Sequence, residues 1–322
     1  MRQTVRYVVK RVTISVLMMV AASVLIFAVL RALPGDPVLA RLAGSQGVDQ
    51  NSIQRLRAEA GLDRPLISQY FSWVTGILHG NLGVSYFSHQ PVSTLLAQRI
   101  GPTLELTILA VVLSVILALP AAVAAAERPG RWIDRLVTSF AAAGMSFPPF
   151  VAGILLILVF SVSLRWLPAR GYTPFTSDPV QNLREMVLPA IALAVGAAPL
   201  VFRYLKGELI TAFDSQYVRT AEGKGASRYQ VIVRHALRNA ALPSLTMIGL
   251  IVGYTLGGSV IVEYAFGISG LGSLSVESAF RRDYAVLQSV VLLVSAMFIV
   301  VTLAVDILTS VLDPRTRVHQ HG

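Results

Sequence analysis

The chain contains six long apolar runs that hold no Asp, Glu, Lys or Arg. A helix needs about 20 apolar residues to cross the roughly 30 Å hydrocarbon core of a bilayer. Because lipid offers the backbone no hydrogen bonds, each run has to satisfy its own amides as a helix. The runs therefore predict an all-α polytopic membrane protein with six transmembrane helices. They cover residues 12–30, 106–126, 136–164, 186–202, 242–262 and 285–305.

Composition supports this fold class. Only 14% of the residues are charged, against about 25% in an ordinary soluble domain. The formal net charge is +10, but the basic residues flank apolar runs, so membrane orientation explains them better than nucleic acid does. The run at 12–30 is too long for a signal peptide and is interpreted as a retained span. The run at 186–202 is the weakest prediction, because it is short and contains Pro189 and Pro199.

Lys and Arg in the flanking segments predict the orientation. With the N-terminus inside, the inner segments carry 16 of these residues and the outer segments 11. The positive-inside rule is reliable only for short loops, and without segment 31–105 the outer count falls to 5. Both termini are therefore expected to be cytoplasmic. The chain divides into a tail and first span (1–30), an extracytoplasmic helical loop (31–105) and a five-span core (106–322) with a cytoplasmic loop at 203–241.

The outer loop 31–105 predicts three short helices. The first covers 52–60, and the second repeats apolar residues at helical spacing from Leu66 to Leu78. Tyr70, Phe71 and Trp73 on that second helix suit the headgroup layer. Pro91 opens the third helix. A cap that seals the bundle and a docking rim for an external partner remain equally open interpretations.

The polar, basic segment 214–243 predicts two short helices separated by a turn. Asp214 or Ser215 can cap the first helix, and Gly225 can end it by taking the left-handed conformation. Ser227 and Gln230 have the spacing of a capping box for the second helix. The apolar face of that second helix is expected to hold Tyr229, Ile232, Val233, Ala236, Leu237 and Ala240.

The opposite face of the second helix is basic. Arg228, Gln230, Arg234, Arg238 and Asn239 lie there, which leaves them for water, lipid headgroups or a protein partner. A basic cytoplasmic loop that merely obeys the positive-inside bias has the same composition. The caps and the glycine between two ordered helices favour a docking element instead.

The spans carry few polar signals. Ser146, Phe147, Pro148 and Pro149 interrupt the third run, and such a break can serve as a hinge, line a path or simply aid packing. Glycines at 249, 253 and 257 predict close helix packing. Three carboxylates, Glu105, Glu263 and Asp306, lie at span ends and are interpreted as interfacial charges. Without a charged residue in mid-span, an ion-coupled carrier is disfavoured.

Catalytic and cofactor motifs are missing from the sequence. There is no GxxxxGK[ST] loop, so the chain should not bind ATP. Cysteine is absent, and the five histidines are scattered, so no metal site is expected. His235 is expected to cap a helix or contact a partner rather than to perform acid–base chemistry. We therefore expect no bound cofactor and no enzymatic activity.

The segment YVRTA…KG…RHALRN…LP (217–243) resembles the cytoplasmic coupling loop of ABC importer permeases. That family has Glu-Ala-Ala, three residues and then Gly. Arg219, Thr220 and Ala221 take the first three places here and Gly225 the glycine, so Arg219 replaces an acid. Glu222 and Gly223 stand where the dipeptide/oligopeptide/nickel branch more often has Arg-Ala, which makes the local charge unusual.

Other segments resemble the same branch in the same order. They are LPGDP at 33–37, residues 61–106, residues 260–288 and DPRTR at 313–317, and Ser269 stands where proline is expected. The long first outer loop is similar to that of the permease with the larger external region. The resemblance places the chain in the bacterial inner membrane.

The resemblance also implies the mechanism and the partners. The chain would be a permease subunit of an importer, working by alternating access on di- or oligopeptides, nickel complexes, glutathione or similar solutes. A second related permease would form a heterodimer with it. Two cytoplasmic ATPases carrying ATP and Mg would pull on the coupling loop, and an extracytoplasmic binding protein would deliver substrate. The loop residues assigned to ATPase coupling are Arg219, Thr220, Ala221, Glu222, Gly225, Ser227, Tyr229, Arg234, His235 and Arg238.

Two other classes of function are weighed against this one. An ATP-independent channel or secondary carrier predicts polar groups in mid-span and inverted repeats, and neither is evident. A membrane enzyme needs a catalytic dyad or carboxylate cluster within the spans, which the sequence does not supply.

Overall fold

The computed structural model describes residues 2–32, 54 and 63–312. All regular elements in these ranges are helices, and one isolated antiparallel bridge joins Val84 and Pro91. The all-α membrane class predicted from the apolar runs is confirmed. The expected helix at 52–60, apart from residue 54, and the motifs at 33–37 and 313–317 lie outside the described residues.

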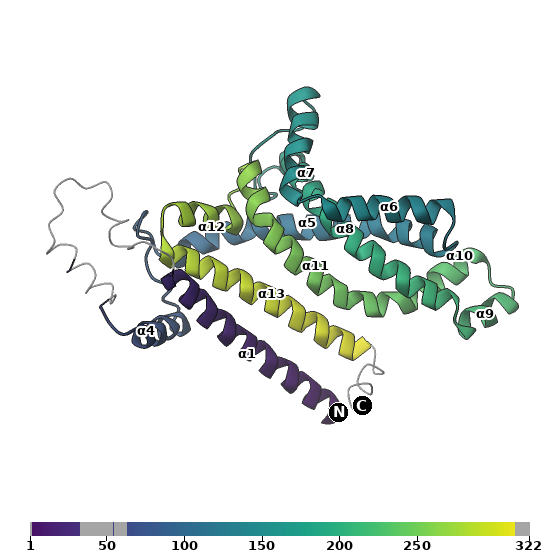
Figure 1. The fold of residues 1–322 in the computed structure, drawn as a ribbon, viewed down its shortest axis with the longest axis horizontal. Helices are drawn as coiled ribbons and strands as arrows, with labels where there is room; N and C mark the ends of the chain where they lie inside the picture. Colours follow the sequence, from purple (N-terminus) through teal and green to yellow (C-terminus); the bar gives the residue numbers. More distant parts are fainter. Residues whose placement is uncertain (1, 33–53, 55–62, 313–322) are drawn as a thin grey trace.

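Five helices are long and apolar enough to cross a membrane, and a bent pair makes a sixth if it counts as one span. α5 and α8 run in the same direction along one bundle, whereas α11 runs opposite to α8, and α13 runs opposite to both α11 and α1 (Figure 1). α1 begins and α13 ends toward the same end of that bundle. The five are α1 (Arg2–Ala32), α5 (Val92–Ala126), α8 (Pro179–Phe213), α11 (Leu237–Phe266) and α13 (Tyr284–Leu312).

The third apolar run forms two separate helical pieces rather than one kinked span. α6 (Trp132–Ser146) is followed by α7 (Pro149–Leu156) and the π-helical η1 (Ile157–Ser163), and the two pieces meet at 98°. A residue before proline is pushed out of the helical region. Phe147 and Pro148, which precede prolines, accordingly have ψ of 120° and 138°. α7 and η1 project from the bundle as a result (Figure 1).

α8 forms the centre of the bundle, although its run was the weakest of the six in the sequence. In its most apolar stretch 72% of the residues are buried, whereas the other four long helices reach 11–33%. α8 contacts α5, α6, α7 and α11. Small side chains let these helices approach closely, and Ala192, Ala194 and Ala197 are fully buried.

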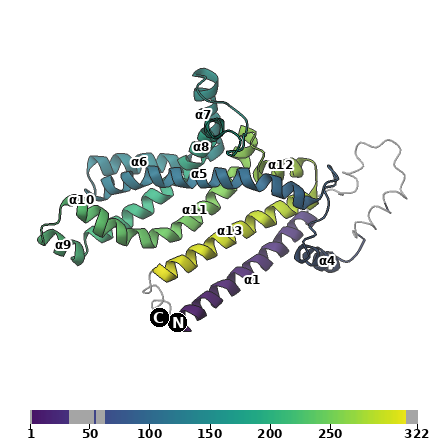
Figure 2. The ribbon, with the colours of Figure 1, turned by 180° about the vertical axis from the view of Figure 1, so that it is seen from behind.

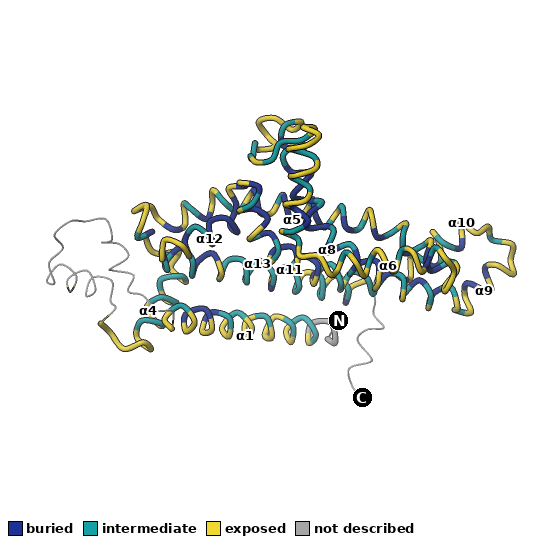
Figure 3. The backbone as a smooth tube through the Cα atoms, turned by 45° about the horizontal axis from the view of Figure 1, so that its top comes forward, coloured by how far each residue is buried: buried dark blue, intermediate teal, exposed yellow. Residues whose placement is uncertain are grey.

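α1 lies at the edge of the bundle alongside α13 (Figure 2), and exposed residues run along its outer side (Figure 3). Near one end of the pair, Arg11 and Asp306 form an ion pair of 2.8 Å. Near the other end of α1, the Ser23 hydroxyl lies 2.9 Å from the hydroxyl of Tyr70 on α4 (Leu66–Leu78). Polar contacts thus fix this peripheral helix near both ends.

α4 confirms the second helix expected in the outer loop. Its aromatic residues are divided between two surroundings. Tyr70 and Trp73 pack against Phe27 of α1, with ring centroids 5.5 and 6.1 Å apart, while Phe71 is 62% exposed. The third expected helix is not separate, because α5 begins at Val92 and continues through the second span without a break.

The glycines of α11 only partly meet the packing prediction. The position of a Cβ on Gly249 would lie 3.6 Å from the backbone of Thr302 on α13, and one on Gly253 would collide with the ring of Phe298. Gly257 has no atom within 4 Å of its Cβ position. Close packing against α13 is therefore confirmed at 249 and 253, and not at 257.

Candidate functional site

The segment at 214–243 lies at one end of the bundle, far from α4 and α12 (Leu271–Phe280) at the other (Figure 1). It contains α9 (Gln216–Gly223), α10 (Arg228–Gln230) and the π-helical η2 (Val231–Ala236), which leads into α11. α9 packs against η2 and the end of α8. We call the exposed part of α9, the turn that follows it, α10 and η2, together with the first turn of α11, the coupling surface.

α9 ends as predicted at Gly225, whose φ is +82°. The Gly225 amide donates to the Glu222 carbonyl at 2.9 Å, and the Ala226 amide donates to the Ala221 carbonyl at 3.1 Å. These two bonds form a Schellman motif, which satisfies the last carbonyls of a helix and favours glycine at the left-handed position. The turn between α9 and α10 is thus a defined structure.

The expected side-chain cap at the start of α9 is wrong. Ser215 occupies the N-cap position but makes no cap bond, because its hydroxyl donates to the Ala212 carbonyl instead. Asp214 is the C-cap of α8. α8 extends to Phe213, so both polar side chains fall in the tight connection between two helices.

The capping box predicted at Ser227 is present. The Ser227 hydroxyl accepts from the Gln230 amide at 3.4 Å, and the Gln230 side-chain oxygen accepts from the Ser227 amide at 2.9 Å. The helix that begins here does not stop after two turns. α10, η2 and α11 follow each other directly from Arg228 to Phe266. The predicted second short helix is therefore continuous with α11, the fourth of the five long helices.

The buried face of this segment differs from the predicted face. Val231, Ala236 and Ala240 are buried, whereas Tyr229 is 72% exposed and Val233 45% exposed. A π-helical turn holds more residues than an α-helical turn. The expected 3.6-residue register therefore fails across η2, and two apolar side chains remain on the surface.

Most of the residues assigned to coupling lie on the coupling surface. His235 is half-buried, and Ala221 lies on the buried face of α9. The exposed members are Arg219, Thr220, Glu222, Gly225, Ser227, Tyr229, Arg234 and Arg238. They form a mixed basic and aromatic surface that a protein partner could contact.

Arg228 holds this surface to the bundle, a role that was missing from the sequence analysis. Its Nε donates to Glu127 at the end of α5 at 3.0 Å, and its Nη1 lies 3.4 Å from Glu222. The guanidinium also sits 4.9 Å from the ring centroid of Phe213. Each contact is half-exposed and weak alone, but together they connect α9, α5 and α8. No local pattern pairs residues 127 and 228, which lie far apart in the sequence.

The break at Ser146–Pro149 lies beside α11 rather than beside the coupling surface. The Ser146 hydroxyl donates back to the Ala142 carbonyl, and Phe147 is 46% exposed. The ring of Pro149 lies 3.6 Å from the Cβ position of Gly258. The bend therefore meets the last third of α11, and its role as a hinge or path lining stays a prediction.

The three carboxylates expected to be interfacial all have specific surroundings. Glu105 accepts from the Tyr172 hydroxyl at 2.9 Å, and burial together with this carboxylate raises the pKa of Tyr172 to about 12. Asp306 pairs with Arg11. Glu263 is fully buried, so its interpretation as an interfacial charge is wrong.

Removing the capping hydroxyl at Ser227 should loosen the start of the coupling helix. Ser227→Ala removes the acceptor for the Gln230 amide, which should cost about 1 kcal/mol locally. Hydrogen exchange should then be faster at the amides of residues 228–231. Ser215→Ala is the matched control, because that hydroxyl caps no helix, and exchange at the start of α9 should stay unchanged. Equal protection in the two variants would contradict the capping role.

Comparison with known proteins identifies the family. Residues 114–318 match the family described as binding-protein-dependent transport system inner membrane component, and residues 4–107 match its N-terminal family. Together these matches cover almost the whole chain. The chain belongs to the binding-protein-dependent transport system inner membrane components.

Several permeases of this family are similar over their full lengths. The glutathione transport system permease protein GsiC of Escherichia coli is 40% identical, covering 97% of this chain and 98% of its own. "Probable peptide ABC transporter permease protein y4tP" of Sinorhizobium fredii is 37% identical, covering 97% and 99%. A solved structure of the MetNI methionine ABC transporter is similar in fold, with a TM-score of 0.57 and 19% identity over 68% of this chain and 96% of that one.

These similarities settle the broad class. The chain is a multi-pass inner-membrane permease subunit of an ABC importer. The resemblance carried by the loop motif and the outer-loop segments is confirmed at the level of the family.

Proposed function

We propose that this permease imports small peptides, including short thiol peptides of the glutathione kind. The full-length similarity to permeases named for peptides and for glutathione supports this substrate class, since glutathione is itself a small peptide. We further propose that the coupling surface and both termini face the cytoplasm, as the distribution of Lys and Arg predicts.

The coupling surface is proposed to receive a cytoplasmic ATPase. One observation carries this proposal: the helix capped at Ser227 continues without interruption to Phe266 at the other end of the bundle. Force applied at Tyr229 or Arg234 therefore acts directly on a membrane helix, without a flexible linker to absorb it. Rigid elements of this kind transmit motion between distant sites.

The proposed assembly contains four further chains. A second, related permease completes the path, two ATPases bind ATP and Mg, and an extracytoplasmic binding protein delivers the peptide. This chain itself is proposed to hold no cofactor. A conformational change requires a partner that interacts differently with two states, and nucleotide binding and hydrolysis in the ATPases would supply that difference.

Purification with its genomic neighbours tests the assembly. Tagged wild-type chain should be coexpressed with the candidate subunits encoded beside it and then purified in mild detergent. It should retain one related permease and two ATPase chains. A variant carrying Gly225→Pro and Arg234→Glu should keep the permease and lose the ATPases, because it disrupts the turn and the surface charge. Recovery of wild-type chain alone and stable would contradict the proposal.

A further inference from the structure

α12 is a short helix at the end of the bundle opposite the coupling surface (Figure 1). It follows α11 after a tight turn at Gly267, whose φ is +65°. α12 packs against α5, α11 and α13. Its attachment therefore decides how this end of the permease can move.

A buried carboxylate attaches the start of α12. Glu263, on the last turns of α11, is fully buried. Its Oε2 accepts from the Ser273 amide at 3.1 Å, in the first turn of α12. The first amides of a helix have no partner within the helix and favour negative charge. Glu263 thus takes the capping place that Gly270, at the N-cap, cannot fill with a side chain.

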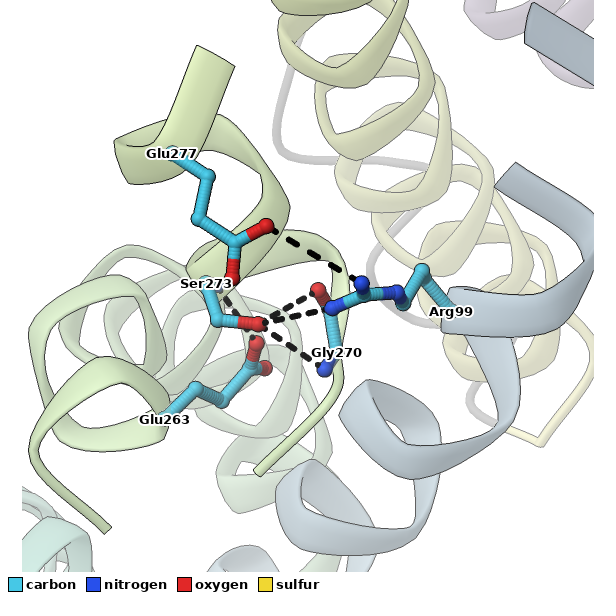
Figure 4. Close-up of polar contacts among 5 residues, drawn as sticks. All are labelled: Arg99, Glu263, Gly270, Ser273 and Glu277. Atoms are coloured by element: carbon cyan, nitrogen blue, oxygen red, sulfur yellow. Dashed lines mark hydrogen bonds and ion pairs between the residues drawn. The ribbon is translucent and has the colours of Figure 1, made fainter. Parts of the chain in front are cut away.

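The same carboxylate reaches α5. The Thr103 hydroxyl donates to Glu263 Oε1 at 2.8 Å and accepts from the Leu271 amide at 2.7 Å. Thr103 is itself buried. One side chain from each of α5 and α11 therefore joins the first turn of α12 in a single buried network (Figure 4 shows Glu263 and Ser273).

A second, more exposed layer covers this network. Arg99 of α5 donates from Nη1 to the Ser273 hydroxyl at 3.4 Å, and its Nη2 lies 3.9 Å from Glu277 of α12 (Figure 4). The Ser273 hydroxyl also donates to the Gly270 carbonyl at 3.0 Å. Both layers join the same two helices, so they resist the same separation.

Separating α12 from α5 would cost free energy. It would leave the buried Leu271 amide without a partner and remove the Thr103 donor from the buried Glu263 carboxylate, and a buried charge that loses a partner is strongly destabilising. We infer that Glu263 is a positioning residue that locks α12 and the adjoining ends of α5 and α11 into one rigid body during transport. The inference rests on the proposed function. Since α11 also carries the coupling surface, a displacement there would reach α12 undiminished.

Cross-linking within one variant tests the rigid body directly. The chain has no cysteine, so Arg99→Cys with Glu277→Cys adds the only thiol pair to it. A reducible bis-methanethiosulfonate reagent should join the pair in the complex reconstituted with its ATPases. Peptide uptake with the link intact should remain within about twofold of uptake after reduction. A tenfold loss that reductant restores would overturn the inference, because α12 would then have to leave α5 in each cycle.

Substitutions test the role of the carboxylate. Glu263→Gln replaces one acceptor oxygen with an NH₂, so either the Ser273 amide or the Thr103 hydroxyl loses its acceptor. We expect peptide transported per ATP hydrolysed to fall at least fivefold, while the ATPase rate stays within twofold. Glu208→Gln makes the same change at a half-buried carboxylate on α8 that belongs to neither layer, and it should retain the ratio.

Substitutions at Thr103 distinguish a positioning role of the buried network from general destabilisation of the chain. Thr103→Val removes the bridging hydroxyl and should lower the ratio, while Thr103→Ser restores it. A normal ratio in Glu263→Gln would overturn the inference. If the Glu263→Gln chain does not insert into the membrane, the cross-linking experiment alone tests the inference. Wild-type transport without ATP would contradict the proposed function, whereas ATP-driven wild-type transport that the cross-link blocks contradicts the rigid body only.

Discussion

Arg234→Glu combined with Arg238→Glu should reduce ATP-driven transport about tenfold or more, while the chain still inserts and still binds its partner permease. Both arginines are exposed on the coupling surface. Charge reversal turns any attraction to an acidic partner into repulsion, and like charges facing each other across an interface cost several kcal/mol. Uptake of labelled peptide into liposomes holding the complete complex measures the effect.

Arg184→Glu is a control for charge reversal away from the coupling surface, to be compared with Arg234→Glu alone as well as with the double variant. Arg184 is an exposed arginine near the start of α8, at the end of the helix far from the coupling surface. The same chemical change there should leave ATPase association intact. Loss of ATPases from both variants to the same extent would mean that overall charge matters and the coupling surface does not.

Gly272→Val should destabilise the permease by about 3 kcal/mol or more, since overpacking of this kind costs 1–3 kcal/mol even where side chains can move aside. A Cβ at Gly272 would lie 2.5 Å from the Val260 Cα and 2.9 Å from Glu263 Oε2. The Cα belongs to a helix backbone and cannot rotate away. The chain should therefore melt at a clearly lower temperature in detergent, or fail to accumulate.

Gly257→Ala is the control for Gly272→Val, and it should not destabilise the chain. This glycine lies inside α11, and nothing is within 4 Å of its Cβ position. Alanine favours the helix by up to about 1 kcal/mol over glycine, so thermal stability should be unchanged or higher. If Gly272→Ala melted at the same temperature as Gly257→Ala, the close approach of α12 to α11 would be wrong.

Features that depend on neighbouring residues could be predicted from the sequence. The apolar runs, the left-handed glycine at 225 and the capping box at Ser227 each follow from a few adjacent positions, and all are present. Features that depend on distant partners could not. The Arg228–Glu127 contact and the burial of Glu263 arise where helices meet, and no local pattern marks them.

α8 shows why hydropathy ranked the spans in the wrong order. A helix that faces lipid needs length and apolar side chains, whereas a helix enclosed by protein needs small side chains that permit close approach. The alanine-rich run at 186–202 is short and contains two prolines, so it is a weak candidate for a helix that faces lipid. Its small side chains suit a helix enclosed by protein, and it forms the core of the bundle. The 98° angle of the bend could not be predicted for a related reason. Consecutive prolines predict that the helix breaks, but the angle between the two pieces depends on how they pack against other helices.

The most direct test of the central claim is the ATP requirement of peptide uptake. The purified complex should be reconstituted in liposomes with the binding protein and labelled peptide. The account predicts uptake that needs ATP and Mg at the ATPases and that falls at least tenfold with Arg234→Glu and Arg238→Glu. Uptake by this chain alone, at an equal rate without ATP, would contradict it and indicate a carrier or channel.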